Sequence, residues 1–136
     1  MVALIEDREE DAELISEVFR EYNSSKEEMV WFQNAESFLM FLKNEGSDNL
    51  KLIISDLKMD VIDGIELLKR LEKEKKYKQI PFVVLSTSVM ESDVTESYKY
   101  GANGYVTKPI ELDSLRSKIA SISNFWLKVN TTFGAQ

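Results

Sequence analysis

The sequence predicts an α/β fold built on one doubly wound parallel sheet with helices on both faces. Three observations predict it. Five short apolar segments alternate with five stretches of helical spacing, the apolar segments are continuous, and the 136 residues suffice for one domain with a buried core. Strands covered on both faces are apolar throughout, and each helix serves as the crossover to the next parallel strand.

The predicted strands are the continuous apolar runs. In chain order they are Val2–Ile5, Met29–Phe32, Leu52–Ile54, Phe82–Leu85 and Tyr105–Val106. No internal repeat or interdomain linker interrupts the alternation. We therefore expect one domain over residues 1–127 and a C-terminal tail over residues 128–136, with Asn130–Gln136 frayed and no output domain.

The first two predicted helices carry apolar residues on one face. These residues are Ala12, Ile15, Phe19 and Tyr22 in the first helix, and Ala35, Phe38, Leu39 and Leu42 in the second. The third helix presents Ile65, Leu68 and Leu71 in the same way.

Local signals mark where the later helices begin and end. Asp63 with Glu66 has the spacing of a capping box at the start of the third helix. The fourth helix is expected over Ser92–Tyr100, with Gly101 placed to end it. The last helix should start near Glu111 and reach at least Ser123.

Composition excludes several kinds of site and partner. The chain has no Cys and no His, which excludes disulfides, zinc and haem sites and Ser-His-Asp catalysis, so any metal must be a hard cation bound by oxygen. With 24 acidic and 17 basic residues the net charge is −7, which argues against a nucleic-acid partner. Six basic residues crowd Lys69–Lys78, which we interpret as a solvated helix end.

The apolar runs also argue against a membrane segment. The longest unbroken run, Phe38–Leu42, is far too short to span a bilayer. Glu6 and Asp7 follow the first apolar run at once, which is not typical of a signal peptide. We expect a cytoplasmic protein with no membrane partner.

Polar side chains follow four of the predicted strands at their carboxyl ends. Glu6-Asp7 follows the first strand, Asp56 the third, Ser86-Thr87 the fourth and Lys108-Pro109 the fifth. In an open parallel sheet these ends share one edge, where ligands bind. Three carboxylates, a hydroxyl and an ammonium are therefore expected to converge.

Three neighbouring carboxylates repel one another unless a proton or a cation intervenes. Oxygen ligands alone favour magnesium or manganese, which leave coordination positions open for phosphoryl oxygens. Simpler interpretations exist for each residue alone. Glu6 and Asp7 could cap the first helix, Lys108 could be a surface lysine, and Tyr105 could be half-buried packing.

We expect Trp31 and Trp126 to lie far from this site.

Four segments together resemble the receiver domain of two-component response regulators. They are Ala3–Asp7, Ile54–Gly64, Pro81–Ser86 and Gly104–Pro109, in matching order and spacing, and the resemblance covers about residues 1–125. It implies a flavodoxin-like (βα)5 fold with strand order 2-1-3-4-5. It also implies a phosphoacceptor signalling domain that is not an enzyme, beyond catalysing its own phosphorylation and dephosphorylation.

The resemblance assigns a metal set and a reaction set. Asp7, Asp56 and the backbone carbonyl of Lys58 would bind Mg2+ directly, with Mn2+ as the alternative, and Glu6 would act through a bound water. Asp56 would be the phosphoacceptor, Lys108 would pair with the phosphoryl group, Ser86 would move to bond it, and Tyr105 would follow inward. The phosphodonor implied is a sensor histidine kinase.

The chain departs from the family pattern at two positions. Asp60 replaces the usual Pro four residues after the phosphoacceptor and adds a negative charge near the site. The switch hydroxyl is Ser86 rather than the more common Thr, so it lacks the methyl group that restricts rotamers. In the family, the positions of Lys58 and Ser88 tend to set the phosphoryl lifetime.

With no output domain expected, the output must be a contact with a downstream protein that the sequence does not identify. One candidate surface is a heptad stripe on the last helix: Leu112, Leu115, Ile119, Ile122, Trp126 and Val129. Its first part should pack on the domain's own sheet. We expect Phe125–Leu127 to form a homodimer contact; the alternative is that the last helix bends and these residues fold back on the same molecule. Leu85–Ser88 and Asn124–Leu127 look similar to stand-alone receivers that partner bacterial phytochromes.

Other functions fit the residues less well. A pseudo-receiver that binds without phosphorylation would not need the retained Glu6, Asp7, Asp56, Ser86 and Lys108. A haloacid-dehalogenase-like phosphatase needs a second Asp two positions after its nucleophile, where this chain has Lys58. A flavin site lacks its phosphate loop, because only Asp7–Glu10 follows the first strand.

Overall fold

The structure is a computed structural model that describes all residues except 24–25 and 133–136, so the end of the predicted tail lies outside the described residues. In the described part, five strands alternate with five α-helices: β1 Val2–Ile5, α1 Glu9–Tyr22, β2 Met29–Phe32, α2 Ala35–Glu45, β3 Leu52–Ser55, α3 Gly64–Glu72, β4 Phe82–Ser86, α4 Glu91–Lys99, β5 Gly104–Thr107 and α5 Leu112–Asn124. A 3₁₀-helical turn, η1 (Lys75–Tyr77), precedes β4, and a π-helical turn, η2 (Phe125–Val129), follows α5.

All strands pair in parallel in the order β2-β1-β3-β4-β5, which confirms the predicted fold class and strand order. The register aligns the strand ends. Ile5 pairs with Ser55, and Ser86 pairs with Thr107. The residues that follow β1, β3, β4 and β5 therefore emerge at one edge of the sheet, as the sequence predicts.

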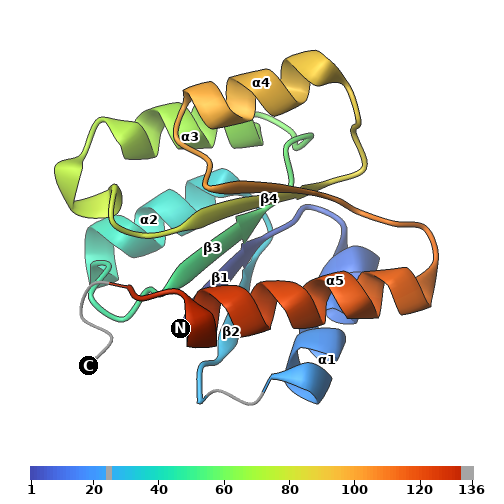
Figure 1. Cartoon of the computed structure of the whole chain (residues 1–136). Coiled ribbons are helices and arrows are strands. Elements are labelled where there is room, and N and C mark those ends of the chain that lie inside the picture. Colours follow the sequence, from blue (N-terminus) through green and yellow to red (C-terminus); the bar gives the residue numbers. More distant parts are fainter. Residues whose placement is uncertain (24–25, 133–136) are drawn as a thin grey trace.

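Helices α1 and α5 cover one face of the sheet, and α2, α3 and α4 lie on the other (Figure 1). Successive strand residues alternate between the two cores. Leu4 and Ile54 pack with α1 and α5, whereas Ala3 and Ile53 pack with α2 and α3. This two-sided burial explains why the strands are continuously apolar.

Side-chain caps fix the starts of α2 and α3. Asn34 Oδ1 accepts a hydrogen bond from the Ser37 amide at 2.8 Å, and Asp63 Oδ1 accepts one from the Glu66 amide at 2.8 Å. The Glu66 side chain instead bonds Arg70, so only half of the predicted capping box forms. Among the described residues no side chain makes a cap hydrogen bond to the first turn of α1. Glu6 Oε2 accepts only from the amide of Arg8, the residue before the helix, at 3.3 Å, so neither Glu6 nor Asp7 acts as the helix cap.

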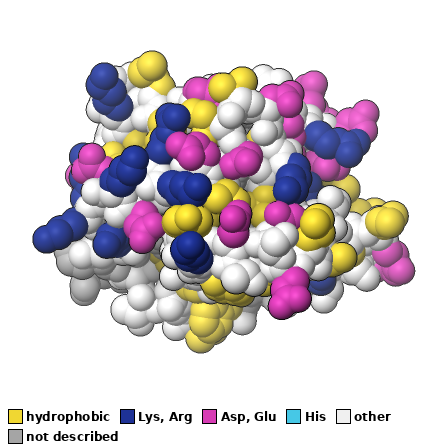
Figure 2. Space-filling view, turned by 90° about the horizontal axis from the view of Figure 1, so that it is seen from above, with side chains coloured by type: hydrophobic (Ala, Val, Ile, Leu, Met, Phe, Trp, Pro, Cys, Tyr) yellow, Lys and Arg dark blue, Asp and Glu magenta, His cyan; other side chains and the backbone are white. Residues whose placement is uncertain are grey.

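The basic segment extends beyond the end of α3. Only Lys69 and Arg70 lie in the last turn of α3, and Lys75 and Lys76 belong to η1. Lys69 Nζ lies 4.7 Å from the centre of the Tyr100 ring, so part of the cluster is ordered by cation–π contact. Seen from above, Lys and Arg side chains gather on the left of the molecule, and Asp and Glu are more numerous on the right (Figure 2).

The residues after α5 do not all remain unpacked, although we expected Phe125–Leu127 to be left over from the domain's core. The turn η2 continues α5 into the predicted tail, and Trp126 and Leu127 pack against the same core as α1 and α5. Trp126 lies over Gly104 of β5, and its ring meets the Phe125 ring edge-to-face at 4.8 Å. Phe125 stays 46% exposed and Val129 61% exposed. No helix among the described residues is long and apolar enough to cross a membrane.

Candidate phosphoacceptor site

Three carboxylates meet beyond the ends of β1 and β3. Glu6 and Asp7 follow β1, Asp56 follows β3, and one carboxylate oxygen from each lies within 4.8 Å of the others. Glu6 is almost fully buried at 1% exposure, and the Asp56 side chain is 12% exposed. The structure thus brings together the acids that the sequence placed at one edge.

Backbone contacts fix the position of Asp56. Its amide donates to the Ile5 carbonyl at 3.1 Å, and its Oδ1 accepts from the Leu57 amide at 2.7 Å. The other oxygen, Oδ2, lies 3.5 Å from Lys108 Nζ. The carboxylate is therefore oriented by its own strand end, with one oxygen facing the lysine.

Lys108 is buried among acids, so the interpretation as a surface lysine is wrong. Its Nζ lies 2.5 Å from Glu6 Oε1 and 3.2 Å from Asp11 Oδ2, besides its contact with Asp56. Its amide donates to the Ser86 carbonyl at 2.7 Å, which attaches the loop after β5 to the end of β4. One ammonium thus faces three carboxylates.

Burial and charge shift two pKa values in this cluster. Burial raises the pKa of Glu6 to about 7, against the hydrogen bond and charge of Lys108, and the nearby Asp56 charge raises it further. Burial alone would lower the pKa of Lys108, but the hydrogen bond to Glu6 and the charges of Asp56, Glu6 and Asp11 outweigh it and raise the pKa. Lys108 therefore stays cationic, and the acids still carry more negative charge than one lysine offsets.

The two predicted switch residues meet at Ser88. Ser86 is fully buried, and its Oγ accepts a hydrogen bond from the Ser88 amide at 3.2 Å. The Tyr105 hydroxyl donates to the Ser88 carbonyl at 2.9 Å. Tyr105 is half-buried, as the packing interpretation predicts, but its hydroxyl also bonds the loop after β4.

The loop after β3 is packed closely against Asp56. A Cβ on Gly64 would lie 2.5 Å from the Asp56 carbonyl oxygen, and the Gly64 amide donates to the Leu57 carbonyl at 2.8 Å. Only glycine permits this approach. Val61 in the same loop has φ of 65°, which is unusual for a β-branched residue, and it is 90% exposed.

Three residues with contacts in this region were missed or misplaced by the sequence analysis. Asp11 lies in the first turn of α1, directly after the acids that follow β1, and that position could have found it. Asp93 bonds both Lys58 and Ser88, and no sequence pattern signals it. Trp31 was expected to lie far away, which is wrong, because its Nε1 donates to the Glu6 carbonyl at 2.7 Å.

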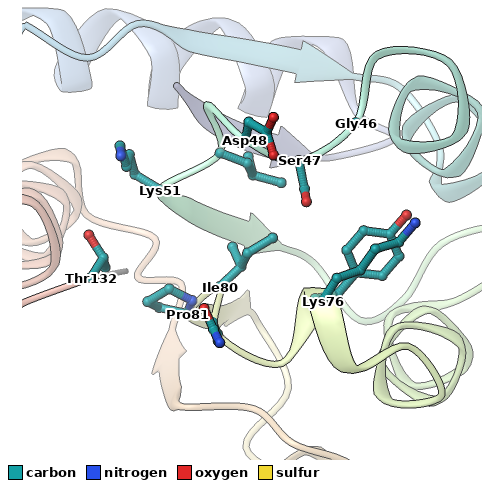
Figure 3. A pocket seen from close by; sticks show the side chains of 11 residues that line it. Gly46, Ser47, Asp48, Lys51, Lys76, Ile80, Pro81 and Thr132 are labelled. Carbon is teal, nitrogen blue, oxygen red and sulfur yellow. The ribbon is translucent and has the colours of Figure 1, made fainter. Parts of the chain in front are cut away.

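A large surface hollow lies away from this chemistry. It encloses about 560 Å³ between the loops that precede β3 and β4, and Lys51, Lys76 and Pro81 are among its lining residues (Figure 3). Asp48 is the only acid that lines it among the described residues. Since converging carboxylates define the site, size alone does not locate it here.

In this parallel sheet, Asp56 follows β3 and lies close to the two acids after β1 and to the buried Lys108. This combination of strand order and site defines a receiver-type signalling domain. Residues 2–120 match the family described as response regulator receiver domain. The chain belongs to this family, whose members are signalling domains of two-component systems that accept phosphoryl groups from histidine kinases.

Relatives match nearly the whole chain. Response regulator Rcp1 of Synechocystis is 33% identical over 96% of this chain and 91% of its own length. The crystal structure of the phosphorylated cyanobacterial phytochrome response regulator RcpA has a TM-score of 0.88, 33% identity, and coverage of 97% of this chain and 96% of that one. The crystal structure of Mn2+-bound Rcp1 has a TM-score of 0.84, 32% identity, and coverage of 96% of both chains.

Proposed function

We propose that this chain is a response regulator receiver that accepts a phosphoryl group on Asp56 from a sensor histidine kinase in a Mg2+-dependent reaction. The observation that carries the proposal is the placement of the Asp56 carboxylate, with its Oδ2 3.5 Å from the buried Lys108 ammonium and two further carboxylates beside it. The similarity to phytochrome response regulators favours a phytochrome-type kinase as the donor.

The transfer uses Asp56 as the nucleophile. A carboxylate oxygen of Asp56 bonds to phosphorus as the phosphorus–nitrogen bond of the kinase phosphohistidine breaks, and the imidazole nitrogen keeps the electron pair. Lys108 places a fixed positive charge beside the oxygen that faces it and so stabilises the phosphoryl oxygens. This chain has no His, so the phosphohistidine comes from the partner.

The acid cluster fits a divalent cation because it holds more negative charge than Lys108 neutralises. Asp7, Asp56 and the Lys58 carbonyl would hold Mg2+, with Glu6 acting through water. The Mn2+-bound form of the relative Rcp1 supports a divalent cation at this cluster. When bound, the ion supplies positive charge to the transferring phosphoryl oxygens.

Phosphorylation acts by changing which proteins the chain contacts. Ser86 exchanges its bond with the Ser88 amide for one with a phosphoryl oxygen, and Tyr105 gives up the Ser88 carbonyl and turns inward. The surface around Ser88 and Tyr105 then changes, and a downstream protein binds the changed surface. The chain acts as an enzyme only on itself.

The test of the proposal is intact-mass measurement after incubation with Mg2+ and acetyl phosphate. We expect the wild type to gain one phosphoryl group and Asp56→Asn to gain none. Stoichiometric gain by Asp56→Asn would sink the assignment, and no gain by the wild type would favour the phosphorylation-independent pseudo-receiver. Asp60→Asn is the matched control, because it removes a neighbouring carboxylate and should leave the gain intact.

We also propose a homodimer through the C-terminal helix, now restricted to the exposed pair Phe125 and Val129, which lie one turn apart. Phe125→Ser with Val129→Ser should weaken the dimer by about tenfold or more, because burying large apolar side chains contributes on the order of 1–2 kcal/mol each. Sedimentation measures this, with Met40→Ser on α2 as the exposed apolar control. A monomeric wild type at high micromolar concentration, phosphorylated or not, would defeat the dimer.

A further inference from the structure

One carboxylate joins the two loops that flank the phosphoacceptor. Asp93 lies in the first turn of α4, and its Oδ1 is 3.2 Å from Lys58 Nζ, two residues after Asp56. Its Oδ2 accepts a hydrogen bond from Ser88 Oγ at 2.5 Å, two residues after Ser86. The Asp93 side chain is only 13% exposed, whereas the Lys58 side chain is 65% exposed.

Ser88 passes this connection on to both switch residues. Its amide donates to Ser86 Oγ at 3.2 Å, and its carbonyl accepts from the Tyr105 hydroxyl at 2.9 Å. Its Oγ, besides donating to Asp93, accepts from the Met90 amide at 3.2 Å. The amide, carbonyl and hydroxyl of Ser88 therefore all form hydrogen bonds. Asp93 thus holds in place the residue whose backbone groups bond Ser86 and Tyr105.

The charge of Asp93 suits this role. The hydrogen bond from Ser88 lowers the pKa of Asp93, and the hydrogen bond and charge of Lys58 lower it further against the effect of burial. Both contacts are made to carboxylate oxygens of Asp93, one of them by the Lys58 ammonium, and hydrogen bonds between charged groups are stronger than neutral ones.

We propose that Asp93 is a positioning residue that opposes phosphorylation by holding Lys58 and Ser88 in their present positions. The inference rests on the proposed phosphoacceptor function. For Ser86 to reach a phosphoryl oxygen it must leave the Ser88 amide, and for Lys58 to reach one it must leave Asp93. Both movements break contacts that Asp93 organises, so loss of its charge favours the conformation that accepts the phosphoryl group.

The experiment measures the initial rate of phosphoryl gain from acetyl phosphate with Mg2+ by intact mass. Asp93→Asn keeps the size and removes the charge, and we expect the rate to rise about fivefold, the factor that corresponds to about 1 kcal/mol. Ser88→Ala removes the hydrogen bond from Ser88 Oγ to Asp93 but keeps the amide and carbonyl of residue 88, and it should also accelerate the reaction. Because both changes break one network, the double variant should be no faster than Asp93→Asn.

A matched control is Asp113→Asn, which removes an acid in the first turn of α5 whose side chain is 85% exposed. Its rate should equal that of the wild type. A wild-type or slower rate in both Asp93→Asn and Ser88→Ala would overturn the inference, as would independent, multiplying effects of the two changes. If the wild type itself gains no phosphoryl group, the proposed function fails instead, so the two failures are distinct.

Discussion

The two loops that flank Asp56 are held in place by different means. The loop after β3 is fixed by backbone packing, since Gly64 approaches the Asp56 carbonyl so closely that no side chain fits. The loop after β4 is held by polar groups, with Ser88 bonded to Ser86, Tyr105 and Asp93. Packing resists displacement, whereas hydrogen bonds can be exchanged for others of similar strength.

This difference matches the different tasks of the two loops. A nucleophile must be held within a small distance of its productive position, because misplacement costs much of the rate. A switch must have a second arrangement that differs by only a few kcal/mol. The acceptor therefore lies on the packed side of the site, and the switch hydroxyl lies on the hydrogen-bonded side.

The largest expected effect comes from breaking the packed side. Gly64→Ala places a Cβ against the Asp56 carbonyl oxygen and the Leu57 backbone, and we expect it to lower the free energy of unfolding by about 3 kcal/mol and to slow phosphorylation. Chemical denaturation measures the first effect and intact mass the second.

Gly104→Ala is the matched control, because a Cβ there would meet its nearest atoms only at 3.7 Å, an ordinary contact. Equal stability of the two alanine variants would mean that close packing does not fix the acceptor loop, and the contrast between the loops would be lost.

The second effect concerns the divalent cation, which should bind on the packed side. Asp7→Asn should weaken Mg2+ binding by about tenfold to 100-fold, and Glu6→Gln should weaken it less, because Glu6 acts through water. Trp31 fluorescence can follow the titration, since the indole bonds the Glu6 carbonyl at 2.7 Å. Calorimetry provides an independent check, and a larger loss in Glu6→Gln would reverse the proposed ligand roles.

Much of this arrangement could be predicted from sequence because it depends on strand ends. Continuous apolar strands place Glu6, Asp7, Asp56 and Lys108 at one edge once the sheet is parallel. The strand order itself came from the family resemblance. That order also puts Trp31 opposite Leu4, two residues before Glu6, and so places Trp31 next to the site.

The remaining features depend on local geometry that no periodic pattern records. The contacts of Asp93 exist because the first turn of α4 lies beside Ser88 of the preceding loop and Lys58 of the loop after β3. The sequence pattern predicts that the last helix ends before Phe125 and that the aromatic residues after it do not pack on the domain's own core. The π-helical turn instead carries Trp126 back onto β5.

The smallest expected effect sharpens the contrast at the one strained position of the packed loop. Val61 is the only non-glycine residue with positive φ among the described residues, and its side chain is 90% exposed, so it makes little packing in return. Val61→Asn should therefore raise the free energy of unfolding by about 1 kcal/mol, because Asn tolerates the left-handed region far better than a β-branched residue does. Val89→Asn in the loop after β4 is the control, since Val89 is also exposed, at 74%, and has no positive φ. Thermal or chemical denaturation of both variants decides the point. If the two substitutions shift stability equally, the gain is a surface effect, and Val61 stores no strain beside the phosphoacceptor.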